Sequence, residues 1–336
     1  MLNLYKILFF LMTIIGTLIA ISSYSWLSMW MGLEINLLSI IPLLKDSNNM
    51  FPSESALKYF ITQSLASSIL LMSIILSLNL KEFFMENMQF LSMMMNSALL
   101  TKMGAAPFHA WFPEVMEGLN WMTGLLMLTW QKIAPMILIF YSCNLSMFFL
   151  LIILISTIFS GILGLNQISL RKILTYSSIN HISWMLASMF YSQTTWLIYF
   201  SIYSLITLNI VIIFNFLKIF YLNQLFSSLN YSKSLKFSFL LNFLSLGGLP
   251  PFLGFFPKWL VINNLILNKF YFLSLLLILF TLITLFFYLR ICFSTMMLNT
   301  KETLIFLPKK LNFKILLINF FSLSGLLICT LIFNYV

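Results

Sequence analysis

Apolar stretches of about 20 residues follow one another along the chain, each long enough to cross roughly 30 Å of hydrocarbon as an α-helix. Helices satisfy their own backbone groups inside a bilayer, which irregular segments do not. We predict eleven spans, near residues 4–22, 25–44, 54–80, 89–109, 119–142, 146–165, 173–191, 195–217, 237–268, 271–297 and 315–334. The pattern therefore predicts an all-α polytopic membrane protein that forms a single transmembrane domain over residues 1–336.

Two of the predicted spans contain residues that interrupt a helix, and the two interruptions are alike. Residues 107–113 read Pro-Phe-His-Ala-Trp-Phe-Pro, and residues 251–257 read Pro-Phe-Leu-Gly-Phe-Phe-Pro. Glycines precede both segments, and proline breaks the hydrogen bonding of a helix interior. Because the segments lie five spans apart, their chain directions across the bilayer are opposite. The pattern predicts an inverted repeat with two discontinuous helices, which is typical of transporters whose site lies near the membrane midplane.

The composition agrees with a membrane protein and argues against a nucleic-acid-binding one. Hydrophobic residues make up 61% of the 336 residues and charged residues only 8%, whereas soluble domains carry about 25% charged residues. The formal net charge of +10 comes from basic residues scattered among the loops, and they form no continuous face. We therefore expect membrane lipids as partners and no nucleic acid.

The basic residues between the spans predict the orientation of the chain. If the eleven spans alternate in direction, only Lys81 and Lys269 fall on one side of the membrane. The opposite side carries Lys6, Lys45, Arg171, Lys172, Lys218, Lys233, Lys236, Lys301, Lys309, Lys310 and Lys314. Under the positive-inside rule, the amino terminus faces the basic compartment and the carboxyl terminus faces the opposite one.

Four ionisable residues fall near the middle of predicted spans, namely Glu34, Lys102, Lys132 and Lys258. Each costs at least ~2.5 kcal/mol to insert into a membrane. Burial weakens the proton affinity of a lysine and a nearby carboxylate strengthens it, so such groups can exchange protons near neutral pH. A series of them suits a proton relay. The alternative is a structural ion pair between Glu34 and one lysine, but buried ion pairs seldom add net stability and this one leaves two lysines unmatched.

His181 and Lys58 are further candidates for the relay. His181 lies near the middle of the seventh span and titrates close to neutral pH, although a single histidine on a helix is as often a satisfied core residue. Lys58 lies about one turn inside the third span, so it either extends the polar path or reaches back to the membrane surface. Three residues after the first interruption could link the relay to bulk water: His109, Glu114 and Glu117. Solvation in a loop explains the two acids equally well.

The chain carries no motif for a metal or a redox cofactor. Cys143, Cys292 and Cys329 lie far apart in apolar surroundings without the spacing of metal ligands. Glycine-rich nucleotide loops and metalloprotease motifs are absent from the sequence. We therefore expect no cofactor and no metal on this chain.

Five segments carry a resemblance to a known family. They are 31–39, 102–115, 130–135, 169–181 and 244–259. The last reads Leu-Ser-Leu-Gly-Gly-Leu-Pro-Pro-Phe-Leu-Gly-Phe-Phe-Pro-Lys-Trp and is highly specific. In this order they closely resemble the antiporter-like membrane subunits of mitochondrial NADH–ubiquinone oxidoreductase, respiratory complex I, which are similar to subunits of sodium/proton antiporters. The resemblance covers nearly the whole chain, with a family core at about 25–290, and the long lateral helix of the distal antiporter-like subunit is absent.

The resemblance implies roles for the buried charges. Glu34 and Lys102 would be the coupled pair of the input half, Lys132 the connecting lysine and Lys258 the output lysine. Protons would cross the inner mitochondrial membrane, driven by electron transfer in other subunits that bind NADH, FMN, iron–sulfur clusters and ubiquinone. The partners would be the other membrane and peripheral subunits of the complex, especially neighbouring antiporter-like subunits. The amino terminus would face the matrix and the carboxyl terminus the intermembrane space.

Two other functions remain open from the sequence. A free-standing sodium/proton antiporter would transport in response to sodium without NADH. A structural membrane subunit would use its buried charges only to hold helices together, so that replacing Glu34 by glutamine would prevent assembly rather than pumping.

Overall fold

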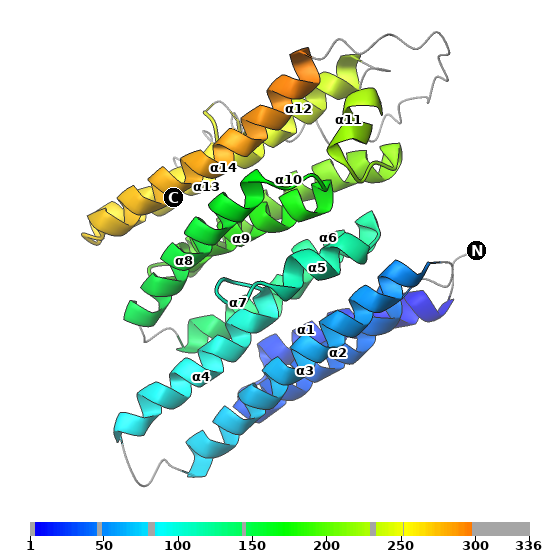
Figure 1. The fold of residues 1–336 in the computed structure, drawn as a ribbon. Helices are drawn as coiled ribbons and strands as arrows, with labels where there is room; N and C mark the ends of the chain where they lie inside the picture. Colours follow the sequence, from blue (N-terminus) through cyan, green and yellow to red (C-terminus); the bar gives the residue numbers. More distant parts are fainter. Residues whose placement is uncertain are drawn as a thin grey trace. The chain divides into compact units, whose positions relative to one another are not determined.

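The structure is a computed structural model that describes residues 4–45, 49–79, 85–142, 146–228, 233–250 and 252–297. These ranges are almost entirely α-helical and contain no named β-strand (Figure 1). The prediction of an all-α membrane protein is therefore confirmed. The chain divides into two compact units, Met1–Ile152 and Ile153–Val336.

The first unit contains the first seven helices of the described residues. Its helices are α1 (Leu4–Ser22), α2 (Trp26–Leu44), α3 (Met50–Asn79), α4 (Met85–Met103), α5 (Trp111–Gly118), α6 (Trp121–Leu128) and α7 (Trp130–Ser142). Within this unit α2 packs between α1 and α3, and α3 also contacts both α4 and α5 (Figure 1). The two halves of the interrupted fourth span, α4 and α5, therefore pack against the same long helix, α3.

The second unit has a similar order of helices. They are α8 (Ser146–Leu165), which begins just before the boundary, α9 (Leu170–Met189), α10 (Gln193–Leu217), the short α11 (Leu222–Ser228), α12 (Lys233–Gly247), α13 (Phe255–Leu267) and α14 (Tyr271–Met297). Helix α9 contacts α10, α13 and α14, and every residue from Ile173 to Met189 is buried. A polar side chain on α9 therefore faces protein rather than lipid.

The helices agree with the predicted spans as far as the described residues extend. Each of the first ten spans corresponds to a helix or to a pair of consecutive helices. Among the described residues, seven helices are long and apolar enough by length and composition to cross a membrane. The other spans are interrupted or are rich in polar residues. The eleventh span, 315–334, lies outside the described residues, so the count of eleven stays a prediction.

Both interruptions are confirmed, and they share one backbone geometry. Helix α4 ends at Met103, and α12 ends at Gly247. Gly104 and Gly248 follow with φ of 76° and 78°. In each case the N–H of the residue after the glycine donates a hydrogen bond to the carbonyl five residues earlier. Ala105 donates to Leu100 at 3.1 Å, and Leu249 donates to Leu244 at 3.3 Å. This is a Schellman cap, and glycine adopts its left-handed residue without strain.

The two caps occupy equivalent places in an internal repeat. The numbering offset that pairs Gly104 with Gly248 also pairs the two motifs that begin at 107 and 251. After each break a second helix starts, α5 at Trp111 and α13 at Phe255. Each unit therefore contains one discontinuous helix built in the same way. That the two run in opposite directions across the membrane stays a prediction.

The fifth span contains a third interruption that the sequence analysis did not predict. Helix α6 ends at Leu128 and α7 begins at Trp130, with Thr129 between them at φ −118° and ψ −70°. The N–H of Lys132 donates to the carbonyl of Thr129, three residues back, at 3.2 Å. Pro135 was the available signal, because it cannot donate a hydrogen bond to the carbonyl four residues before it.

Glycines bring α1 and α2 into close backbone contact. A Cβ added at Gly32 would lie 2.5 Å from the backbone nitrogen of Ala20, and one added at Gly16 would lie 2.8 Å from that of Asn36. Small residues at such crossings allow membrane helices to pack closely. Gly32 lies two residues before Glu34, so this packing also fixes the backbone beside a predicted relay residue.

Replacing Gly32 by alanine is expected to destabilise the protein by about 1–3 kcal/mol, since backbone rather than a flexible side chain must move. The thermal midpoint of the purified assembly measures this effect. Gly124→Ala is the matched control, because its Cβ would meet only the flexible end of Met116, at 3.1 Å. Equal midpoints for the two variants would contradict the close packing.

Candidate functional site

Lys102 and Glu34 come together inside the first unit. Lys102 lies in the last turn of α4 and is only 8% exposed. Glu34 lies in the middle of α2, is partly buried and interacts electrostatically with Lys102. Among the described residues the two charges form no direct ion pair. The carboxyl end of α4 carries a partial negative charge that favours a cation there, so Lys102 has two sources of attraction.

A small polar cavity lies beside Lys102. Its volume is about 20 Å³, which is enough for one water molecule. Its lining consists of Leu33, Asn36, Leu37, Tyr59, Gln63, Lys102, Gln131 and Pro135. The side chains of Asn36 and Gln131 exchange two hydrogen bonds across it, at 3.0 and 2.9 Å. The sequence analysis missed these amides, although the five polar residues of the lining lie on four predicted spans and were a signal that something polar is enclosed.

Lys132 is also buried in the first unit. It lies in the first turn of α7, just after the break at Thr129, and is 1% exposed. Its ammonium group is 5.6 Å from the centre of the Phe112 ring, which belongs to α5. The face of an aromatic ring attracts a cation. Glu34, Lys102 and Lys132 are therefore all found in one unit, and the two lysines lie next to its two breaks.

Lys258 lies in the second unit and contacts the end of a broken helix. It is in the first turn of α13 and is 7% exposed. Its Nζ donates a hydrogen bond of 2.8 Å to the carbonyl of Gly247, the last residue of α12, and lies 5.8 Å from the centre of the Trp184 ring. The break frees that carbonyl from intrahelical bonding. A helix end, rather than a carboxylate, thus compensates the charge.

His181 lies in the same unit beside the same break. Its Nδ1 and the hydroxyl of Tyr199 are 2.9 Å apart, and the ring centre of Tyr203 is 4.9 Å from that of the imidazole. These three residues line a cavity of about 10 Å³ together with Ser245 and Gly254, which flank the break. The cavity is at the lower limit for one water molecule. The sequence analysis found His181 but not its aromatic and hydroxyl neighbours.

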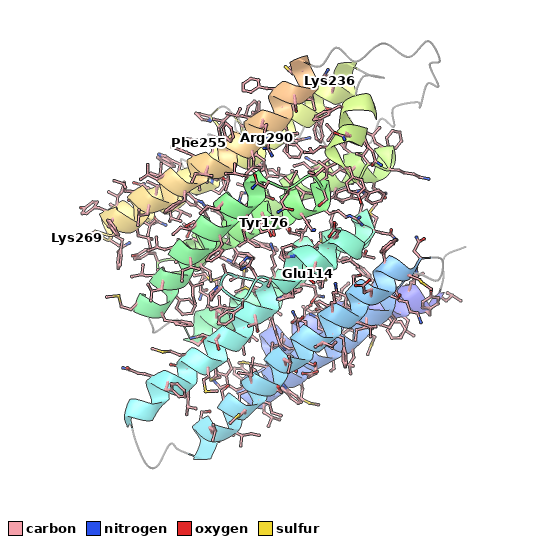
Figure 2. The ribbon with its side chains drawn as sticks, in the orientation of Figure 1. Glu114, Tyr176, Lys236, Phe255, Lys269 and Arg290 are labelled. Atoms are coloured by element: carbon pink, nitrogen blue, oxygen red, sulfur yellow. The ribbon has the colours of Figure 1, made fainter. Side chains whose placement is uncertain are left out.

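Lys58 occupies a different environment from the buried lysines. Its Nζ lies 3.1 Å from Glu54 on α3 and 3.3 Å from Glu114 on α5, and its side chain is 44% exposed. Glu114 projects from the helix that follows the break (Figure 2). Exposed ion pairs of this kind contribute little stability. The neighbouring residue, Tyr59, lines the cavity beside Lys102, so a role for Lys58 in the path stays a hypothesis.

The two remaining candidates, His109 and Glu117, differ in how deeply they are buried. His109 is buried after the break, and Glu117 on α5 is half-buried. In the part of the chain that the structure describes, no three His, Cys, Asp or Glu side chains gather as a metal site, and Cys292 is buried without a disulfide. Cys143 and Cys329 lie outside the described residues.

Known proteins match this chain over nearly its full length. A family model described as "NADH:quinone oxidoreductase/Mrp antiporter, TM" matches residues 23–284. The proteins named NADH-ubiquinone oxidoreductase chain 2 of Aedes aegypti and Anopheles gambiae are 52% and 48% identical, and each alignment covers 97% of both chains. That of Locusta migratoria is 47% identical over 98% of this chain and 96% of its own.

Solved structures share the fold at lower identity. A chain of respiratory complex I from Thermus thermophilus with bound aureothin has a TM-score of 0.85 at 22% identity, covering 98% of this chain and 79% of that one. A chain of the Mrp complex from Dietzia has a TM-score of 0.75 at 14% identity, covering 84% of this chain and 59% of that one. These likenesses confirm the antiporter-like fold, and the sequence matches confirm the predicted resemblance. The chain therefore belongs to the family of transmembrane proteins that NADH:quinone oxidoreductases share with Mrp antiporters.

Proposed function

We propose that the chain is a proton-translocating membrane subunit of NADH:ubiquinone oxidoreductase in the inner mitochondrial membrane. The names of the relatives, which are 47–52% identical to it, support this function. Its partners are the other membrane and peripheral subunits of the complex, especially the neighbouring antiporter-like ones. NADH, FMN, iron–sulfur clusters and ubiquinone bind to other subunits, and this chain uses the energy that their electron transfer supplies. The amino terminus faces the matrix.

The proposed mechanism is a relay of protonation changes. A change in the charge on Glu34 alters the proton affinity of Lys102, because the two groups interact electrostatically inside the membrane. Lys102 then exchanges a proton through the cavity beside it, and Lys132 passes the change on. Lys258 completes the relay, with the free carbonyl end of α12 stabilising its charged form. His181 belongs to the half that contains Lys258.

One observation favours this relay over a structural ion pair. Glu34 and Lys102 interact electrostatically and yet make no direct ion pair among the described residues, while a cavity of about 20 Å³ opens beside Lys102. A pair whose only task was to join helices would gain most from direct contact, since direct contact is what repays desolvation. A lysine beside room for water, with its carboxylate partner not in direct contact, is better suited to exchanging protons.

The test is the substitution Glu34→Gln in the assembled complex. It keeps the shape of the side chain and removes the charge, so we expect normal assembly and a fall of roughly fivefold or more in protons pumped per NADH oxidised. Purified complex in proteoliposomes, with a pH-sensitive dye inside, gives this ratio. The control is Glu54→Gln, an acid of the same unit whose side chain is 64% exposed and which should leave the ratio unchanged.

The competing functions predict other results. Full pumping by an assembled Glu34→Gln complex would refute the relay, and loss of assembly would favour the structural subunit. Sodium-dependent transport that needs no NADH would favour a free-standing antiporter.

A further inference from the structure

Asn36 and Gln131 form a reciprocal hydrogen-bonded pair between two helices of the first unit. Asn36 Nδ2 donates to Gln131 Oε1 at 3.0 Å, and Gln131 Nε2 donates to Asn36 Oδ1 at 2.9 Å. Asn36 is 4% exposed and Gln131 is half-buried. Each amide therefore satisfies the other in surroundings where an unpaired amide is costly. Two hydrogen bonds also fix the rotamers of both side chains.

The pair joins the chain segments that carry the proposed relay residues. Asn36 lies two residues after Glu34 on α2, and Gln131 directly precedes Lys132 on α7. Helix α7 packs mainly against α1, α4 and α6. The two amides thus add a direct link from α2 to α7. This link lies at the cavity where Lys102 is found.

The amides retain capacity for a water molecule. A primary amide has two N–H donors and two acceptor positions, and the reciprocal contact uses one of each. Both amides line the cavity of about 20 Å³, together with Lys102, Tyr59 and Gln63. A buried water molecule needs two to four polar partners, so this lining is sufficient to bind one.

We propose that the Asn36–Gln131 pair is a positioning element that holds one water molecule against Lys102 and keeps the segment carrying Glu34 in register with the segment carrying Lys132. The inference rests on the proposed function and deepens it. Amides do not titrate, so the pair carries no charge itself. A proton leaving Lys102 Nζ forms a bond to the water oxygen, while the water releases one of its own protons toward the neutral amine of Lys132, the next group of the proposed relay. Lys102 ends neutral, Lys132 ends charged, and the water is unchanged.

The test breaks the pair and then rebuilds it. Asn36→Leu and Gln131→Leu each leave one amide without its partner, and each should lower protons pumped per NADH oxidised by at least fivefold in proteoliposomes containing the whole complex. The double variant N36L/Q131L should be no worse than either single one. The exchanged pair N36Q/Q131N keeps the combined length of the two side chains and should restore pumping to within twofold of the unaltered complex.

A matched control is Asn96→Leu. Asn96 is also a fully buried amide that joins two helices of this unit, donating to the carbonyl of Ser142 at 3.3 Å, but it does not line the cavity. Its loss should lower the thermal midpoint and leave the pumping ratio of the assembled complex unchanged. A fall in pumping equal to that of Asn36→Leu would show that any lost amide contact has this effect, and would overturn the inference.

Further outcomes separate this inference from the proposed function. If Lys102→Met abolishes pumping while both leucine variants pump normally, or if the exchanged pair pumps no better than the singles, the positioning role is wrong and the proposed function stands. If Lys102→Met pumps normally, the proposed function fails. If the leucine variants do not assemble, the variant Gln131→Glu tests the positioning role instead, because glutamate has the shape of glutamine and adds a titratable group. A shifted pH profile of pumping would support the positioning role, and an unchanged profile would overturn it.

Discussion

Replacing Lys258 by methionine is expected to lower proton pumping by about a hundredfold in complex that still assembles, which is the size of effect typical of losing a proton-transfer group. Methionine fills much of the same volume without the charge. The ammonium group makes one hydrogen bond, to the carbonyl of Gly247, and lies near the Trp184 ring. Removing a charge from the membrane relieves an insertion cost of at least ~2.5 kcal/mol, so assembly should survive.

Protons pumped per NADH oxidised in proteoliposomes measure the effect of Lys258→Met. Lys269→Met is the control, because that lysine is exposed at the turn between α13 and α14, away from the break (Figure 2). It is expected to pump normally. Normal pumping by both variants would mean that Lys258 is a structural cap for α12 and that protons leave by another route.

The contact of Lys258 with the end of α12 links protonation to structure. The charged form is attracted both by the Gly247 carbonyl and by the partial negative charge at the carboxyl end of the helix. The neutral amine keeps a hydrogen bond but loses most of that attraction. We therefore expect deprotonation of Lys258 to weaken the contact between α13 and α12 at the break.

The sequence was sufficient to predict the features that depend on local chemistry. Apolar runs gave the first ten spans because each run is long enough to bury a helix in a membrane. Both interruptions were predictable because Gly104 and Gly248 lie where the chain needs positive φ and where the following prolines prevent a helix from continuing. The burial of Lys102, Lys132 and Lys258 followed from their depth in these spans.

The partners of the buried side chains were not predictable in this way. Periodicity indicates which face of a helix is buried, but not which residue of another helix faces it. Asn36 and Gln131 are 95 positions apart, and nothing local marks them as a pair. The neighbours of His181 were missed for a related reason, because α9 is buried all round and has no distinct polar face.

The environment of Lys58 and the break at Thr129 are two features that the local sequence pattern did not determine. The depth of Lys58 in its span left two interpretations, and the contact that distinguishes its environment, with Glu114, comes from a helix beyond the first interruption. The break at Thr129 has no glycine beside it to mark it in the sequence. Proline in the same span indicated an irregular helix without locating the irregularity.

Replacing Gly254 by alanine is expected to prevent the second unit from folding correctly, and so to prevent the chain from assembling into the complex. The added Cβ would overlap the carbonyl of Ser245, which belongs to α12. Backbone atoms cannot yield as a flexible side chain does, so overpacking here should cost about 3 kcal/mol or more. The φ of Gly254 is −66°, which alanine adopts without strain. The predicted effect is therefore one of space alone. The amount of complex on native gels and the thermal midpoint of what remains measure it.

Gly247→Ala is the matched control, because a Cβ there would meet the Tyr288 ring at an ordinary 3.5 Å. The repeat supplies a second argument, since the residue equivalent to Gly254 in the first unit is Ala110, which is exposed and evidently tolerates a Cβ. The two breaks thus share a backbone cap but differ in how closely the following helix approaches. Gly254 and Ser245 line the cavity next to His181. If the Gly254→Ala variant assembles as well as the unaltered protein, the two segments must lie farther apart at this cavity.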